Sequence, residues 1–253
     1  MDFTVKKYEL LLNALKKQNY NFQTFDEFLK QPQLKSIVLR HDVDLLPFNS
    51  LKFAQLQAKL NVKGVYYFRA VPESWNENVI REISALGHEI GYHYECLTTC
   101  NGDMMKGIQD FKKNLNALRE LSQVTTICMH GSPMSKYDSK DLWKTNNYRD
   151  LGIIGEPYFD VDFTKVFYLT DTGRKWDGDK VSVRDKVNSG FELSFKHTDE
   201  IIKHANAGQL PEQIMFTFHP QRWNDNILIW TKELIAQNIK NQIKKYFFVT
   251  QKK

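Results

Sequence analysis

The feature that most constrains the fold is a regular alternation of short apolar runs with longer amphipathic runs. The short runs are rich in β-branched and aromatic residues, and the longer ones carry apolar residues at helical spacing. Two helices are predicted to open the chain. Strands are then predicted at 37–41, 64–70, 88–95, 124–131, 212–220 and 245–250, and helices at about 48–61, 76–87, 103–121, 197–208 and 226–243. Such βα units predict an α/β fold, a distorted (β/α) barrel of about seven strands, with a doubly wound open sheet as the alternative.

The composition fits one domain that spans residues 1–253. The 35 basic and 30 acidic residues are spread along the chain and form no run that would follow a phosphate backbone, so nucleic acid is not expected as a partner. No run of about 18 apolar residues occurs, which argues against a membrane span. The first residues lack the apolar core of a signal peptide, and three cysteines suit a reducing compartment. We expect a cytoplasmic protein, and its oligomeric state stays open.

Four predicted strands end in His or Asp. Side chains alternate between the two faces of a strand, so residues two apart point the same way. By this rule Asp42 and Asp44 share one face while His41 points to the other, and His93 shares a face with Glu95. The other histidines that end predicted strands are His130 and His219. In a barrel, these groups would meet at one rim.

Two carboxylates and several imidazoles at one rim suit a borderline divalent metal such as Zn²⁺. A metal of this kind lowers the pKa of bound water and polarises a carbonyl oxygen. A carboxylate outside the coordination sphere could take the proton of the water, and a histidine on the opposite side could protonate a leaving amine. These groups are the ones that amide hydrolysis needs. The alternative for the Asp pair is a strand-end cap that binds loop amides.

Four segments, RHDVD, GHEIGYHYE, MHGSP and FTFHP, resemble in this order the motifs of the polysaccharide deacetylase family, also called the NodB-homology family. RHDVD corresponds to an HDVD-type variant of the first motif, and the resemblance covers about residues 36–220. It implies a NodB-like distorted barrel of about seven strands. It also implies a metal-dependent hydrolase that removes acyl groups from N-acylated sugars.

The resemblance also implies roles for individual residues. Asp42 would be the general base and Asp44 a metal ligand, and the reverse assignment stays open because Val43 separates the two. His93 matches the first, metal-binding histidine of the second motif. His219 matches the last histidine of the family, the catalytic acid.

The chain departs from the family pattern at the third metal ligand. The family repeats a histidine four residues after the first, and Leu97, which cannot bind a metal, stands there. We expect His130 in its place, because it ends the neighbouring predicted strand on the inward face. Glu95 is the second choice, since it shares the face of His93.

Further differences concern the residues that support the site. MHGSP lacks the arginine that the third motif brings near the base, so Arg40 or Arg174 would hold Asp42 ionised. Asp171 and Trp176 resemble the residues of the fourth motif that orient the acid and wall the pocket.

The expected function is therefore the metal-dependent removal of an N-acetyl or N-formyl group from a sugar, with Zn²⁺ as the expected metal. Because no export signal is seen, the expected substrate is a nucleotide-linked or lipid-linked precursor of a surface glycan. Trp223 would flank the sugar ring or pack against the last predicted helix. Two alternatives remain: a degenerate domain that binds glycan without turnover, and a hydrolase of a non-sugar amide on the same scaffold.

Overall fold

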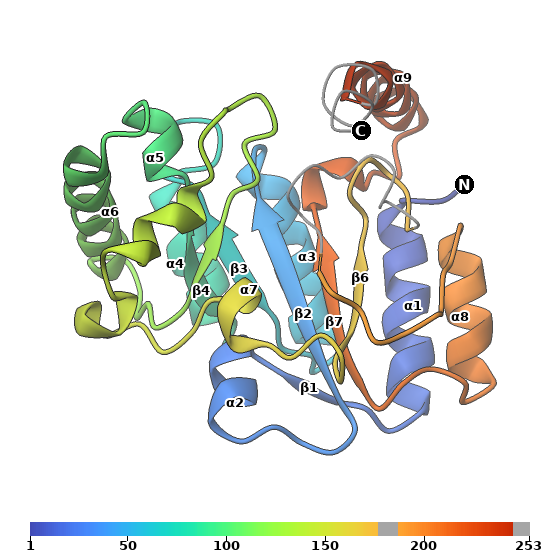
Figure 1. The fold of residues 1–253 in the computed structure, drawn as a ribbon. Helices are drawn as coiled ribbons and strands as arrows, with labels where there is room; N and C mark the ends of the chain where they lie inside the picture. Colours follow the sequence, from blue (N-terminus) through green and yellow to red (C-terminus); the bar gives the residue numbers. More distant parts are fainter. Residues whose placement is uncertain (177–186, 245–253) are drawn as a thin grey trace.

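A curved parallel sheet forms the centre of the molecule (Figure 1). The structure is a computed structural model in which residues 1–176 and 187–244 are described. From one edge to the other the strands follow the order β5, β4, β3, β2, β7 and β6, and β1 pairs with the start of β2. The strands are β1 Asn21–Gln23, β2 Ser36–Val43, β3 Val65–Phe68, β4 Glu89–Tyr94, β5 Ile127–Met129, β6 Phe167–Thr170 and β7 Gln213–Phe218.

Helices connect the parallel strands and cover the outer face of the sheet (Figure 1). α1 lies beside α8, and α3 lies beside α4. The α-helices are α1 Val5–Lys17, α2 Phe25–Lys30, α3 Pro47–Lys59, α4 Glu77–Ala85, α5 Cys96–Thr99, α6 Met104–Arg119, α7 Pro157–Asp160, α8 Thr198–Asn206 and α9 Ile227–Lys244. Short 3₁₀ helices are η1 Ser139–Lys144, η2 Tyr148–Leu151 and η4 Pro220–Arg222.

α4 illustrates how the sequence defines these helices. The side chain of Asn76 accepts a hydrogen bond from the backbone N–H of Val79 and so caps the first turn. Val79, Ile80 and Ile83 form a buried apolar stripe at helical spacing. After the helix, Gly87 has a φ of +86°, a left-handed conformation that glycine adopts without a Cβ clash.

The sheet is a barrel that does not close between β5 and β6 within the described residues. Beyond β5, the segment 154–156 runs alongside the strand: Ile127 N donates to Gly155 O at 3.1 Å, and Ile154 N donates to Thr125 O at 2.8 Å. The expected fold class, a distorted α/β barrel of about seven strands, is therefore confirmed.

The central strand β2 is buried on both faces, as the strands of parallel sheets are. Leu39 and Val43 pack in the core beneath the helices. Val38 belongs to a second cluster inside the barrel. Arg40 and Asp42 follow Val38 at two-residue spacing, so they also point into the barrel, above its apolar floor.

Two strands escaped prediction. β1 has three residues, and β6 lies between the predicted strand 124–131 and the predicted helix 197–208, where no element was predicted. The predicted helices at 48–61, 76–87, 103–121, 197–208 and 226–243 are confirmed as α3, α4, α6, α8 and α9. The predicted strand 245–250 lies outside the described residues. No helix in the described ranges is both long enough and apolar enough to cross a membrane.

Candidate metal centre

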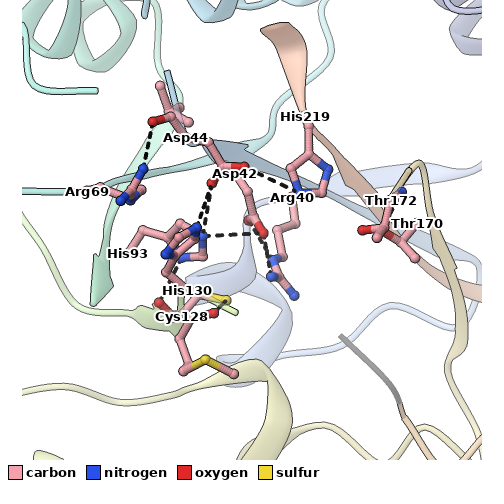
Figure 2. Close-up of polar contacts among 12 residues, drawn as sticks. Arg40, Asp42, Asp44, Arg69, His93, Cys128, His130, Thr170, Thr172 and His219 are labelled. Atoms are coloured by element: carbon pink, nitrogen blue, oxygen red, sulfur yellow. Dashed lines mark hydrogen bonds and ion pairs between the residues drawn. The ribbon is translucent and has the colours of Figure 1, made fainter. Parts of the chain in front are cut away.

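Polar side chains from four strands meet at the carboxyl end of the barrel (Figure 2). Asp42 and Asp44 stand at and just after the end of β2, and His93 stands on β4. His130 follows β5 and His219 follows β7. The structure thus brings together the four residues to which the sequence resemblance gave catalytic or metal-binding roles. It also brings His130 to them, which was expected as the third ligand from its place at the end of a predicted strand.

Three of these residues direct one donor atom each at a common point. His93 Nε2 lies 3.7 Å from Asp44 Oδ1, and His130 Nε2 lies 3.5 Å from the same oxygen. All three donor atoms lie within 4.8 Å of one another. Zinc bonds of about 2.0–2.1 Å at tetrahedral angles separate neighbouring ligand atoms by about 3.3 Å. The three residues therefore fit a divalent ion after small side-chain shifts.

The other ring nitrogen, Nδ1, of both His93 and His130 makes a hydrogen bond within the protein. His93 Nδ1 donates to the carbonyl oxygen of Cys128 at 2.9 Å, and His130 Nδ1 donates to Glu95 Oε2 at 2.9 Å. Each bond fixes the tautomer, so that the lone pair on Nε2 faces Asp44. Burial lowers the pKa of His93 to about 4, against the opposing effect of nearby carboxylates, so its ring is neutral near pH 7.

Among the described residues, none donates a hydrogen bond to the oxygen that faces both histidines. Asp44 Oδ1 is buried and unpaired, whereas Asp44 Oδ2 accepts a hydrogen bond from Gln221 Nε2 at 3.2 Å. A buried carboxylate oxygen without a donor is unusual, and a metal ion is one group that would satisfy it. Burial raises the pKa of Asp44, but the neighbouring imidazoles outweigh it and hold the value below the usual range.

The side chain of Asp42 is hydrogen-bonded by an arginine, Arg40. Arg40 Nε and Nη2 donate to the two oxygens of Asp42 at 2.8 and 2.6 Å, a bidentate pair buried inside the barrel. Burial alone would raise the pKa of Asp42, but the positive charge of Arg40 outweighs it and holds the pKa well below its ordinary range. Of the two arginines considered from the sequence, Arg40 is the one that contacts Asp42.

His219 lies on the other side of Asp44, with its Nε2 at 3.8 Å from Asp44 Oδ2. Its Nδ1 donates to Asp171 Oδ1 at 2.5 Å, and its backbone N–H donates to Asp171 Oδ2 at 3.0 Å. Asp171 is fully buried and also accepts from Trp223 Nε1 and Arg222 Nη1. These donors fix the carboxylate, which in turn fixes the imidazole so that Nε2 points into the site.

Three residues considered from the sequence lie away from the metal centre. Arg174 donates to the carbonyl oxygen of Trp230 under α9 and stacks on Phe3, so it does not support Asp42. Trp176 packs in the aromatic core and donates to Thr198, which places it in the interior and not at a pocket wall. Trp223 is equally buried, against Phe3, and its role is to hold Asp171.

Sequence reasoning missed two residues that touch the centre and one further donor group. Arg69, just after β3, contacts both Glu95 and the backbone of Asp44, and Gln221 bonds Asp44 directly. The signal for Arg69 was its place at the end of the predicted strand 64–70, the same end at which the other polar groups stand. Cys128 Sγ also lies within 4.8 Å of donor atoms of Asp42 and His93.

The fold is an α/β barrel, and at the carboxyl end of its strands one aspartate and two histidines bring donor atoms within 4.8 Å of one another. A scan against family models finds no match, and neither does a search of curated proteins. Solved structures that align with the chain include a CE4 family pseudoenzyme from Bacillus anthracis, at 13% identity over 85% of this chain with a TM-score of 0.43. The chain spans 63% of the length of that protein.

Two further solved structures come from Bacillus subtilis. The family 4 carbohydrate esterase PdaA is 15% identical, with 91% of this chain and 83% of that chain covered and a TM-score of 0.42. The peptidoglycan deacetylase PdaC is 12% identical, with 86% and 99% covered and a TM-score of 0.42. These three structures are thus a carbohydrate esterase, a peptidoglycan deacetylase and a pseudoenzyme. The similarity concerns the fold alone.

Proposed function

We propose that the protein is a metal-dependent hydrolase that removes an N-acyl group from a sugar. One observation carries this proposal: Asp44, His93 and His130 direct unprotonated donor atoms at one point, between a carboxylate on one side and an oriented imidazole on the other. The donor set of two imidazoles and one carboxylate favours Zn²⁺. A divalent ion held there would polarise the carbonyl oxygen of the acyl group and lower the pKa of a bound water molecule.

The side chains around the three ligands then divide the proton transfers. Asp42, kept ionised by Arg40, accepts a proton from the water molecule that adds to the acyl carbon. His219 donates a proton from Nε2 to the nitrogen that departs when the C–N bond breaks, while Asp171 holds the opposite ring nitrogen. The products are a carboxylic acid and an amino sugar. Asp42 as base and Asp44 as ligand is the assignment that the pairing with Arg40 favours.

The first test is metal content followed by turnover. Protein purified without chelator should contain about one Zn²⁺ per chain, and Asp44→Asn and His93→Ala should lose it. The control is His204→Ala, because His204 lies in α8, away from the centre, and its Nδ1 bonds the carbonyl oxygen of Glu200. A protein that retains no stoichiometric metal contradicts the proposal.

The second test uses a panel of N-acetyl and N-formyl sugars in free, nucleotide-linked and lipid-linked form, beside simple non-sugar amides. Release of acetate or formate from at least one sugar is expected, and the linked forms test whether a glycan precursor is the substrate. Turnover of the simple amides alone would instead indicate an amidohydrolase. Binding of a sugar with metal present but no acyl release would indicate a glycan-binding domain.

A further inference from the structure

Arg69, just after β3, contacts two parts of the candidate metal centre, the side chain of Glu95 and the backbone of Asp44. Figure 2 shows the second contact. Its Nε donates to Glu95 Oε1 at 2.7 Å, and its Nη1 donates to the backbone carbonyl of Asp44 at 3.1 Å. The pair with Glu95 is largely shielded, since the two side chains are 19% and 10% exposed. An ion pair at this depth holds its geometry better than one at the surface.

The other oxygen of Glu95 serves His130. Glu95 Oε2 accepts a hydrogen bond from His130 Nδ1 at 2.9 Å and another from Ser132 Oγ at 3.1 Å. An ionised carboxylate can only accept hydrogen bonds, so the proton in this contact lies on His130 Nδ1, and Nε2 is the ring nitrogen that can bind a metal ion. The lone pair of Nε2 then faces Asp44 Oδ1, at 3.5 Å.

We propose that Arg69 is a positioning residue for the metal: through Glu95 it fixes the ring and tautomer of His130, and through the Asp44 carbonyl it fixes the second ligand. This inference rests on the metal centre of the proposed function. It assigns Glu95 to the outer shell and His130 to the inner one. His130 and Glu95, the two residues considered for the third ligand, therefore act together: His130 binds the metal and Glu95 orients His130.

The need for such a residue follows from where the ligands stand. His93 lies on β4 and His130 follows β5, so no common turn of backbone sets one ring relative to the other. Glu95 stands two residues after His93 and bonds His130, and Arg69 extends this link across β3 to Asp44. One guanidinium therefore contacts the segments that follow β4 and β2 directly, and it reaches His130, after β5, through Glu95. Loss of outer-shell partners of this kind costs about 10- to 100-fold in metal affinity.

The experiment compares Zn²⁺ affinity, by competition with a chromogenic chelator, in the wild type, Arg69→Met and Arg69→Lys. The absorption spectrum of the Co²⁺-loaded protein reports the coordination geometry, independently of activity. Arg119→Met is the matched control, because Arg119 is also partly buried but bonds only the backbone carbonyls of Val124 and Leu151. Urea unfolding of each chelator-treated variant reports stability separately. If Arg69→Met does not fold, Glu95→Gln, which removes the charge that Arg69 pairs with, takes its place.

Arg69→Met should bind Zn²⁺ about 10- to 100-fold more weakly and give an altered Co²⁺ spectrum. Arg69→Lys should recover part of the affinity, since it keeps the charge but not the two-armed geometry. Arg119→Met should lose stability and keep its affinity. Wild-type affinity in Arg69→Met, or an equal loss in Arg119→Met, overturns the inference alone. Absence of metal binding in the wild type overturns both this inference and the proposed metal centre. If the wild type binds metal but hydrolyses no sugar, the proposed function is wrong and this inference still holds.

Discussion

Replacing Arg40 by methionine tests the buried pair that supports the proposed base. The substitution removes both hydrogen bonds to Asp42, at 2.8 and 2.6 Å, from a pair whose side chains are 2% and 5% exposed. Breaking a buried pair on one side costs about 3–5 kcal/mol, because the remaining charge is left without compensation. Arg40 Nη1 has no hydrogen-bond partner within residues 1–176 and 187–244, so part of that cost is offset when the guanidinium is removed. We therefore expect the free energy of unfolding to fall by about 3 kcal/mol.

A double-mutant cycle separates the interaction energy of the Arg40–Asp42 pair from the effect of lost packing. Urea unfolding of chelator-treated wild type, Arg40→Met, Asp42→Asn and the double variant gives the four free energies. The double variant contains no uncompensated buried charge, so its loss should be smaller than the sum of the single losses by about 2 kcal/mol. As a control, Lys63→Met breaks the exposed pair with Glu27 and should cost no more than about 1 kcal/mol. Losses that add to within about 0.5 kcal/mol would refute the reasoning.

Three further predictions concern proton transfer, metal linkage and pH. Asp42→Asn and His219→Ala should each lower kcat by about 10²- to 10⁴-fold while metal content stays unchanged; full activity in either variant contradicts the role of that residue. Zn²⁺ at about 100 times its Kd should raise the free energy of unfolding of the wild type by about 2.7 kcal/mol and have no effect on Asp44→Asn, and equal stabilisation of both proteins would argue against Asp44 as a ligand. Burial, opposed in part by backbone N–H donors, raises the pKa of Glu156 from 4.5 to about 7. The folded protein then keeps a proton that the unfolded chain releases, so this group makes stability fall as the pH rises from 4.5 to about 7, by about 2–4 kcal/mol. Glu156→Gln should remove that part of the slope in unfolding measured across this range, and an unchanged slope would show that Glu156 does not cause it.

The inward orientation of the first motif was predictable because it depends only on the two-residue period of a strand. Asp42 and Asp44 both face the site, and Arg40 bonds Asp42 from the same face two residues earlier. His41 faces the other way, where it lies 3.0 Å from the carbonyl oxygen of Val65, and burial lowers its pKa to about 3. A local geometric rule thus reproduces most of the site on β2.

The sequence predicts less well how residues on different strands lie relative to one another. That His130 approaches Asp44, and that Arg69 connects to Glu95, depends on which strands are neighbours and on their register. Trp176 could not be placed by its motif either, since a tryptophan beside a site and one in the core differ only in what packs around them.

α9 shows a limit of reading helix faces from the sequence. The residues turned toward the body include Gln237 and Asn241, and Asn241 donates to the carbonyl oxygen of Gly173. Ile235 and Ile239 are each 56% exposed. Apolar periodicity predicts that a helix exists and how long it is. Which side meets the rest of the chain is decided by tertiary contacts.

The three proposed ligands reach the site from segments that are far apart along the chain. His93 lies on β4, and Asp44 and His130 follow β2 and β5. β4 pairs directly with β5, whereas β3 lies between β4 and β2. An unfolded chain therefore offers no ready-made site, and affinity for the ion is gained only as these strands dock. Removing the ion should loosen this half of the barrel before the half built on β7 and β6, so that backbone amides near β5 would exchange with deuterium soonest.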